Sequence, residues 1–258
     1  MTKSAEDALV EQLSQLGALP PNDLLGRVAV DWVSLPATVG RVYVAFSGHG
    51  ISYLRTADSV HGEETEFLES YRRRFGRPLR PASRPPAGLA PALRTGRAKA
   101  LTYDLRELSS FERAVLTAIQ EIPHGQTRPY SWVAREVGHP GAARAVGSAL
   151  GRNPVPVLIP CHRVTRADGQ PGDYVFGQEA KESLLRAEDV DLDEVRELAA
   201  EQVFYLGSDT TNIVCFPTCH NARRISAAHR RGFRDVVEAE EAGYRPCQHC
   251  RPESMATA

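Results

Sequence analysis

The chain has 258 residues, of which 42% are apolar, and its 31 basic and 32 acidic side chains leave a formal net charge of −1. It is long enough for two or three small domains with ordinary hydrophobic cores. The sequence excludes a membrane helix, since no segment approaches roughly 18 apolar residues, and its start lacks the apolar core of a signal peptide. We therefore expect a cytoplasmic protein, whose five cysteines indicate metal binding or thiol chemistry rather than disulfides.

The charges are segregated along the chain. Residues 1–70 carry four basic and ten acidic side chains, whereas residues 122–166 carry six arginines and one glutamate. A second basic run, residues 220–234, has five arginines and no acidic residue. Solvated surfaces are the common cause of such runs, but two basic stretches that each lie beside a cysteine also favour a polyanionic partner such as DNA.

The N-terminal part is predicted to be an α/β subdomain. Residues 26–56 alternate β-branched and aromatic residues between glycine-bearing breaks, which predicts two or three antiparallel strands. A helix is expected over residues 64–76. Residues 77–93 are so rich in proline that we expect a connector without regular structure.

Helices dominate the next part of the sequence. A serine precedes an apolar stripe and Glu112 is placed to help cap it, which predicts a helix from Phe111 to Ile122. Two short helical patterns, residues 130–138 and 141–153, meet at a Gly-His-Pro-Gly break with the spacing of a helix-turn-helix. Any pair of packed helices shares this pattern, but the arginine excess favours DNA binding, with the second helix as the recognition helix.

One cysteine stands apart from the others. The stretch VLIPCHRV sets Cys161 between an apolar run and the polar residues His162 and Arg163. On their own, these eight residues favour a buried small thiol at the end of a strand.

Two further helices are predicted after this stretch. The first covers residues 177–188, and the second lies in the acidic stretch 189–203, which we interpret as a linker.

The other four cysteines have the spacing of a metal site. Two close pairs lie 27 residues apart, with three residues inside the first pair and two inside the second. This is how a short chain supplies four thiolates to one tetrahedral zinc ion. The predicted ligands are Cys215, Cys219, Cys247 and Cys250. A module of about fifty residues buries little core, so the metal is expected to supply much of its folding free energy.

Residues 111–188 closely resemble the alkylguanine-DNA alkyltransferases, also called methylated-DNA-protein-cysteine methyltransferases. The pieces RAVG, NPVPVLIPCHRV and KxxLLxxE occur in the order of that family. The resemblance implies irreversible transfer of an alkyl group from the 6-oxygen of guanine in double-stranded DNA to Cys161. It also implies that His162 acts through a water as the base, that Glu188 orients it, and that Asn153 ties the turn. For the N-terminal subdomain it implies a ribonuclease-H-like shape.

The same resemblance implies that the guanine leaves the stack, at a cost of a few kcal/mol. Arg144 on the second helix would fill the gap, and Tyr130 would press on the phosphate and border the pocket. Arg163 and Tyr174 are further candidate DNA contacts. Where many family members have a tyrosine, a small residue and two glycines, this chain has Tyr-Val-Phe-Gly over 174–177. Phe176 is expected to narrow the pocket and favour methyl groups, or else to point outward without effect.

Residues 204–252 resemble the zinc domain of the bacterial Ada DNA-repair proteins. That family implies that Cys215 is both a zinc ligand and the acceptor of a methyl group from a methylphosphotriester. Zinc holds a thiol as thiolate at neutral pH, which makes this chemistry plausible. Arg223 and Arg224 are candidate DNA contacts. Methylation removes one negative charge from the centre, so it is expected to tighten DNA binding.

The sequence thus predicts a monomeric, single-turnover DNA-repair protein with α/β and α parts. Its predicted limits are an N-terminal subdomain over 1–100, an alkyltransferase domain with a helix-turn-helix over 101–188, a linker over 189–203 and a zinc domain over 204–258. Three alternatives stay open: a methylation-responsive DNA-binding regulator, a transferase with a purely structural zinc tail, and a lesion binder without transfer. The expected absence of an AraC-type promoter-binding region disfavours the first, and the cysteine at position 161 disfavours the last.

Overall fold

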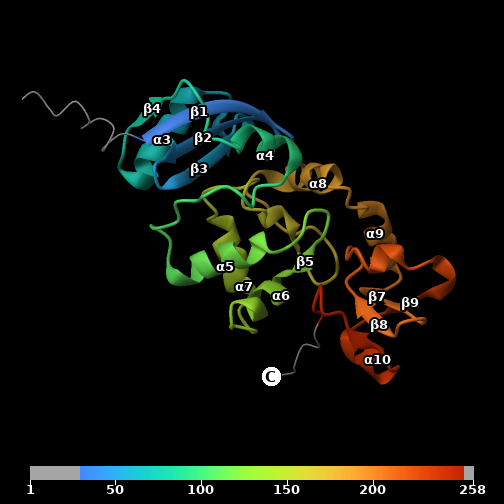
Figure 1. Ribbon diagram of the computed structural model, residues 1–258. Helices are drawn as coiled ribbons and strands as arrows, with labels where there is room; N and C mark the ends of the chain where they lie inside the picture. Colours follow the sequence, from blue (N-terminus) through green and yellow to red (C-terminus); the bar gives the residue numbers. More distant parts are fainter. Residues whose placement is uncertain (1–29, 253–258) are drawn as a thin grey trace, which may run out of the picture.

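The computed structural model of the chain describes residues 30–252 and arranges them as three modules (Figure 1). The N-terminal sheet lies above a group of helices, and a second, smaller sheet lies beside those helices (Figure 1). The expected mixture of α/β and α parts is confirmed. The predicted limits at residues 1 and 258, and residues 26–29 of the first predicted strand, lie outside the described residues.

None of the described helices combines the length and the apolar character that a membrane crossing requires.

Three antiparallel strands form most of the first sheet, as the alternation in the sequence predicts. They are β1 (Val30–Ala37), β2 (Gly40–Ser47) and β3 (Gly50–Thr56), and the order in the sheet is β3-β2-β1-β4. Helix α3 (Glu64–Phe75), which follows the short 3-10 turn η1 (Asp58–Val60), covers one face. The contact is aromatic and involves Trp32, Tyr43, Tyr53, Phe67 and Tyr71.

The prediction that residues 77–93 lack regular structure is wrong at both ends. Strand β4 (Leu79–Pro81) pairs in parallel with β1, and helix α4 (Leu89–Thr95) follows. Pro81 is tolerated because it ends a short strand at the edge of the sheet. Pro91 is tolerated because it lies in the first turn of α4, where the backbone N–H has no partner within the helix.

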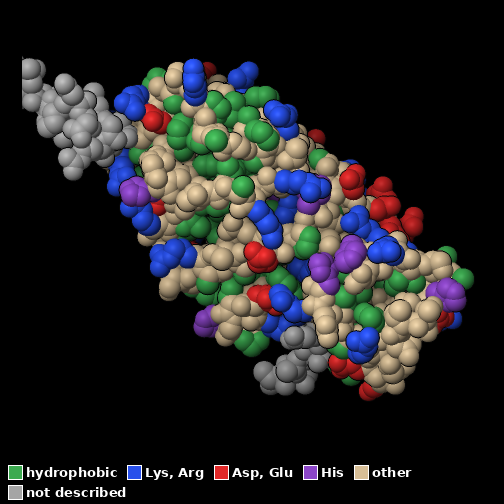
Figure 2. Space-filling model, viewed as in Figure 1, with side chains coloured by type: hydrophobic (Ala, Val, Ile, Leu, Met, Phe, Trp, Pro, Cys, Tyr) green, Lys and Arg blue, Asp and Glu red, His purple; other side chains and the backbone are tan. Residues whose placement is uncertain are grey.

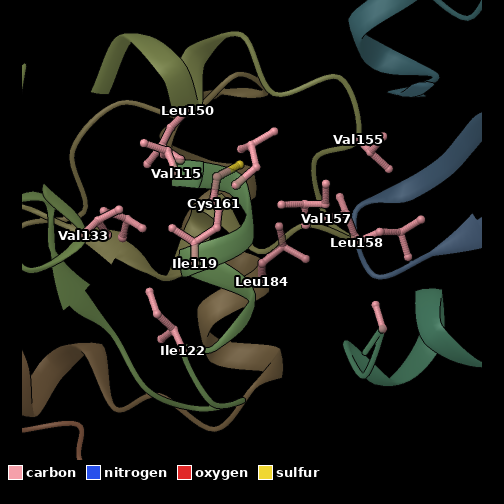
Figure 3. Packing of buried hydrophobic residues seen from close by; sticks show 14 of the residues in the cluster. Val115, Ile119, Ile122, Val133, Leu150, Val155, Val157, Leu158, Cys161 and Leu184 are labelled. Atoms are coloured by element: carbon pink, nitrogen blue, oxygen red, sulfur yellow. The ribbon is translucent and has the colours of Figure 1, made fainter. Parts of the chain in front are cut away.

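Helix α5 (Ser110–Gln120) confirms the predicted helix and its cap. The Ser109 side chain accepts a hydrogen bond from the Glu112 backbone, and the Glu112 carboxylate accepts one from the Ser109 backbone. The two short patterns after it form α6 (Tyr130–Glu136) and α7 (Ala143–Gly151), which pack on each other and on α5. Figure 3 shows the apolar core of this module, with Cys161 inside it.

Two helices then lead to the C-terminal sheet. Helix α8 (Gly177–Ala187) confirms the first predicted helix, and α9 (Leu192–Ala200) confirms that the acidic linker is helical. The Asp191 side chain caps α9. Acidic side chains gather over α9 in Figure 2, in keeping with the composition of the linker.

The second sheet has four short strands in the order β10-β8-β7-β9. They are β7 (Tyr205–Ser208), β8 (Ile213–Cys215), β9 (Arg230–Phe233) and β10 (Arg245–Pro246). The 3-10 turns η3 (Ala222–Arg224) and η4 (Ala227–His229) precede β9, and α10 (Val236–Glu241) follows it. A parallel pair, β5 (Arg128–Pro129) and β6 (Val164–Thr165), lies in the helical module. One buried apolar cluster extends from the first sheet through the helices to the four C-terminal cysteines, so the modules share a continuous core.

Candidate active site and metal centre

The loop before Cys161 is held by Asn153. Its amide nitrogen donates to the Ile159 carbonyl at 3.1 Å and lies 3.2 Å from the Cys161 sulfur, and its amide oxygen accepts from the Val155 backbone at 3.0 Å. Val157 in this loop has φ +71°, a left-handed conformation that costs a β-branched residue on the order of 1–3 kcal/mol. Asn153 therefore ties the turn, and the surrounding contacts hold a strained backbone beside the cysteine.

Cys161 begins the short 3-10 turn η2 (Cys161–Arg163) and lines a cavity of about 430 Å³. The side chain is only 4% exposed, and burial raises the pKa of its thiol, whereas the Asn153 hydrogen bond lowers it. Because burial has the larger effect, the resting thiol is neutral and needs a base to become a nucleophile.

A buried network next to the cysteine can supply that base. His162 Nε2 lies 2.9 Å from Glu188 Oε1, so this ring nitrogen carries the proton in the neutral imidazole. Burial lowers the pKa of His162 despite the nearby carboxylate, which favours the neutral ring. Its Nδ1 is buried and has no hydrogen-bond partner among the described residues. A neutral imidazole with one unoccupied nitrogen is suited to accept a proton.

Arg163 completes this network instead of facing the solvent. Its Nε and Nη2 each donate to the Glu188 carboxylate at 2.8 Å, and its other bonds go to the carbonyls of Ile122 and Gly96. Although burial raises the pKa of Glu188, the hydrogen bonds from His162 and Arg163 hold it well below its usual range. The prediction that Arg163 contacts DNA is therefore wrong, because the side chain is 6% exposed and its donors are used inside the protein.

The walls of the cavity come from α6, α7 and the loop before α8. Tyr130 begins α6, Arg144 is an exposed residue of α7, and Tyr174 lies in the loop, with its ring 6.4 Å from that of His162. Gly172 in this loop has φ +68°, and a Cβ there would lie 3.1 Å from the Tyr130 hydroxyl. The structure thus gathers around Cys161 three of the residues that the sequence assigned to DNA.

The bulk of Phe176 lies elsewhere than the sequence suggested. Val175 lines the cavity, whereas the Phe176 ring packs edge-on against the Tyr174 ring at 5.7 Å. Phe176 is half-buried against the core. The Phe176 side chain therefore neither lines the cavity nor points outward, and its effect on the range of alkyl groups stays a prediction.

Lys181 was not among the predicted site residues, yet it is fully buried beside this site. Its ammonium donates to the Val164 carbonyl at 2.6 Å and lies 6.0 Å from the centre of the Tyr130 ring. Burial lowers the pKa of Lys181 to about 8, and the Cys161 thiolate opposes this shift. A cation here stabilises a thiolate at Cys161. The lysine of the KxxLLxxE piece was the available signal, because a charged residue on the apolar stripe of a helix is seldom buried without a function.

The four C-terminal cysteines come together as the spacing predicts. Parallel pairing of β10 with β8 brings the two pairs side by side, and the four sulfur atoms lie within 4.8 Å of one another. Zinc–sulfur bonds of about 2.3 Å in a tetrahedron place sulfurs roughly 3.8 Å apart. All four side chains are buried, and Asn221 Nδ2 lies 3.4 Å from the Cys247 sulfur. The donor set and its geometry fit one zinc ion.

The zinc module packs directly on α6 and β5. Trp132 Nε1 donates to the Cys250 carbonyl at 3.1 Å, and the hydroxyls of Thr127 and Thr218 are 3.1 Å apart. Arg223 is exposed, but its Nη1 donates to the Asp189 carbonyl at 3.0 Å. Arg224 is exposed as well, so both predicted DNA contacts remain on the surface.

Two family models match consecutive parts of the chain. Residues 110–190 match the DNA-binding domain of 6-O-methylguanine DNA methyltransferase, and residues 194–253 match the metal-binding domain of Ada. A methylated-DNA-protein-cysteine methyltransferase of Mycolicibacterium paratuberculosis is 49% identical over 88 residues, or 34% of this chain and 53% of that protein. Its counterpart in Methanosarcina acetivorans is 45% identical over 82 residues, or 32% and 53%. The chain thus spans about half the length of these curated relatives.

Solved structures match over more of their length. The Mycobacterium tuberculosis O6-methylguanine methyltransferase is 31% identical, with a TM-score of 0.50, and the match covers 62% of this chain and 92% of that one. A structure of Mycobacterium tuberculosis OGT in complex with DNA has a TM-score of 0.52 at 29% identity, and covers 64% and 98%.

Proposed function

Because this chain belongs to the methylated-DNA-protein-cysteine methyltransferase family, we propose that it repairs DNA by irreversible transfer of an alkyl group from the 6-oxygen of guanine to Cys161. One observation carries the proposal. Cys161 lines an open cavity and is followed by a buried, neutral His162 whose Nδ1 has no partner among the residues described. A buried thiol beside a base that a carboxylate orients is the arrangement that a nucleophilic cysteine needs.

The transfer balances with the groups at hand. A water passes the thiol proton to His162 Nδ1 while Glu188 holds the opposite nitrogen, and the new thiolate attacks the alkyl carbon. The bond between that carbon and the guanine oxygen breaks, a thioether forms, and the released guanine anion takes up the proton. Lys181 stabilises the thiolate as it forms. The thioether leaves no acceptor, so each chain turns over once.

The cavity is open enough to receive a base turned out of the duplex. Arg144 on α7 would fill the gap left in the stack, and Tyr130 would press on the adjoining phosphate. Tyr174 would border the base. Double-stranded DNA is therefore the proposed partner, bound through the face that carries α6 and α7.

For the zinc module, we propose methylphosphotriester repair by transfer to Cys215, with Arg223 and Arg224 beside the DNA backbone. The match to the metal-binding domain of Ada and the four-cysteine cluster support it. Zinc would keep the thiols ionised. One observation favours the second candidate, a purely structural zinc: Cys215 is only 1% exposed.

Peptide mapping by mass spectrometry separates these proposals. The full chain is incubated with DNA that carries either O6-methylguanine or a methylphosphotriester, and the Cys161→Ser and Cys215→Ser variants serve as controls. We expect methyl on the Cys161 peptide from guanine and on the Cys215 peptide from phosphotriester. An unmodified Cys161 after guanine-lesion DNA contradicts the main proposal, and an unmodified Cys215 assigns the zinc a structural role.

The remaining assignments are also proposals. We place the limits of the modules at residues 1–100, 101–188, 189–203 and 204–258, and we assign α6 and α7 to a helix-turn-helix. The three antiparallel strands with one parallel edge strand support a ribonuclease-H-like first module. A monomer in the bacterial cytoplasm or nucleoid suits a protein that finds its lesions alone.

A further inference from the structure

Within the part of the chain that the structure describes, Arg128 of the helical module has no anionic partner in that module. It is 1% exposed and is the largest of the fully buried side chains. Its Nη1 donates to the Thr127 carbonyl and its Nη2 to the Gln126 amide oxygen, both at 2.7 Å, while Nε has no partner. Among the described residues no carboxylate pairs with it. A buried guanidinium without an anion is strongly destabilising, so its charge must be compensated from elsewhere.

The rings around Arg128 point to the source of that compensation. The guanidinium carbon lies 5.3 Å from the centre of the Phe216 ring and 5.8 Å from that of Trp132. Phe216 directly follows Cys215, and Trp132 Nε1 donates to the Cys250 carbonyl. Arg128 therefore lies between two rings that adjoin the metal-ligating cysteines, although it belongs to β5 of the helical module.

The charges agree with this position. Burial lowers the pKa of Arg128, and the four cysteine sulfurs, Cys250 before the others, raise it. A zinc ion bound by four thiolates retains two negative charges, and no other described anion neutralises Arg128. At short range inside a protein, attraction between such opposite charges is screened very little by salt.

We propose that Arg128 is the counter-cation of the zinc–thiolate centre, and that the helical module supplies it to the zinc module. The centre is then shared by the two modules: zinc holds the thiolates, the thiolates hold Arg128, and Arg128 holds β5 against the zinc module. This assignment requires zinc at the four cysteines and does not require alkyl transfer. Its failure is therefore distinguishable from failure of the proposed repair activity.

Zinc release from the full, unreacted chain tests the assignment. The rate is followed with a coloured chelator at pH 7 for the original chain, Arg128→Met, Arg128→Lys and, as the control, Arg231→Met. Arg231 belongs to the zinc module and its exposed side chain pairs with Asp209. We expect release at least tenfold faster from Arg128→Met, within threefold of the original rate from Arg128→Lys, and unchanged from Arg231→Met. Release from Arg128→Met within twofold of the original rate overturns the proposal.

Thermal unfolding distinguishes charge compensation from simple packing. Loss of Arg128 should lower the melting temperature of the zinc-loaded protein but not that of the zinc-free protein. Without zinc, the doubly negative centre of one metal ion and four thiolates is not formed, and the buried cation is itself unfavourable. Equal destabilisation of both forms overturns the proposal. If Arg128→Met does not fold, Arg128→Lys decides: release within threefold supports a charge role, and faster release contradicts it.

Discussion

The chain has two buried thiol sites, and they differ in how a thiol can be converted to a thiolate. Burial raises the pKa of Cys161 and so favours the neutral thiol, and in the proposed mechanism His162, which contacts Glu188, removes the proton. The cysteine quartet has no such base among its members, and a metal ion would keep its thiols ionised permanently. The first site can therefore be switched by the protonation of one group, whereas the second depends on the metal.

The difference also extends to what surrounds each site. Cys161 opens onto a cavity of about 430 Å³ lined by tyrosines and an arginine. Cys215 is only 1% exposed and belongs to the same buried apolar cluster as Phe216 and the residues of the helical module. A substrate as large as a flipped base can reach only the first sulfur in this arrangement, and the second would need the module to shift before a phosphotriester could approach.

The largest expected effect tests whether the two thiols act independently. Cys161→Ser should abolish transfer from O6-methylguanine. Attack on a saturated carbon needs a strong nucleophile, and a neutral histidine does not convert a serine hydroxyl into one as it does a thiol. The zinc content, measured by atomic absorption, should stay at one ion per chain. Cys215→Ser should have the opposite result: the zinc content falls, and guanine repair is retained. Loss of both guanine repair and zinc binding in either variant would show that the two thiols do not act independently.

A somewhat smaller effect should follow from the base network. His162→Gln and Glu188→Gln should each slow single-turnover transfer by roughly 10²- to 10⁴-fold, the usual contribution of general-base catalysis. The rate is measured by rapid quench with a methylated oligonucleotide. Glu182→Gln is the matched control, because Glu182 lies on the same helix, α8, but pairs with Arg196 of α9, and it should transfer at the original rate. An unimpaired His162→Gln would remove His162 from the mechanism.

The same network should make the stability of the fold depend on pH. Burial lowers the pKa of His162 in the folded chain, and the unfolded chain binds the proton more readily below about pH 6.5. The contribution of His162 to the free energy of unfolding is therefore fully present above about pH 6.5 and falls as the pH drops. The folded pKa of Glu188 is also depressed, so the contribution of Glu188 is lost below about pH 4.5. Denaturant titrations at pH 7.5 and pH 5 measure the difference. His162→Asn should reduce it, and an unchanged difference would contradict the neutral buried ring.

A moderate effect is expected at the DNA face. Arg144→Ala should lower the transfer rate on duplex DNA by about 10- to 100-fold and have less effect on the free base, because only the duplex leaves a gap to fill. The control is Arg152→Ala, at the end of the same helix, where the side chain pairs with Glu112. Equal losses on duplex and free base would place Arg144 in the chemistry instead.

Spacing in the sequence predicted the metal site well and the thiol site poorly. Two close cysteine pairs specify a tetrahedral centre wherever the chain places them, so the quartet needed no knowledge of the fold. The eight residues around Cys161 favoured an inert thiol, and the family resemblance reversed that interpretation. The direction of each side chain was not predictable, because the Glu188 carboxylate that binds Arg163 lies 25 positions away and meets it only in the folded core. Arg128 was missed for the same reason, since its anion belongs to another module.

The smallest expected effect concerns the shape of the cavity at Cys161. Val175 lines that cavity, whereas Phe176 packs against Tyr174, so the two neighbours should differ in what they control. Val175→Gly should raise the rate on O6-benzylguanine severalfold and leave the rate on O6-methylguanine within about twofold, since removing a wall side chain relieves contact only with the larger group. Phe176→Ala should change the benzyl-to-methyl ratio little and lower the melting temperature instead, because it leaves a gap in the core. If Phe176→Ala alone widened the range of substrates, Phe176 would control the width of the cavity indirectly, through its contact with Tyr174.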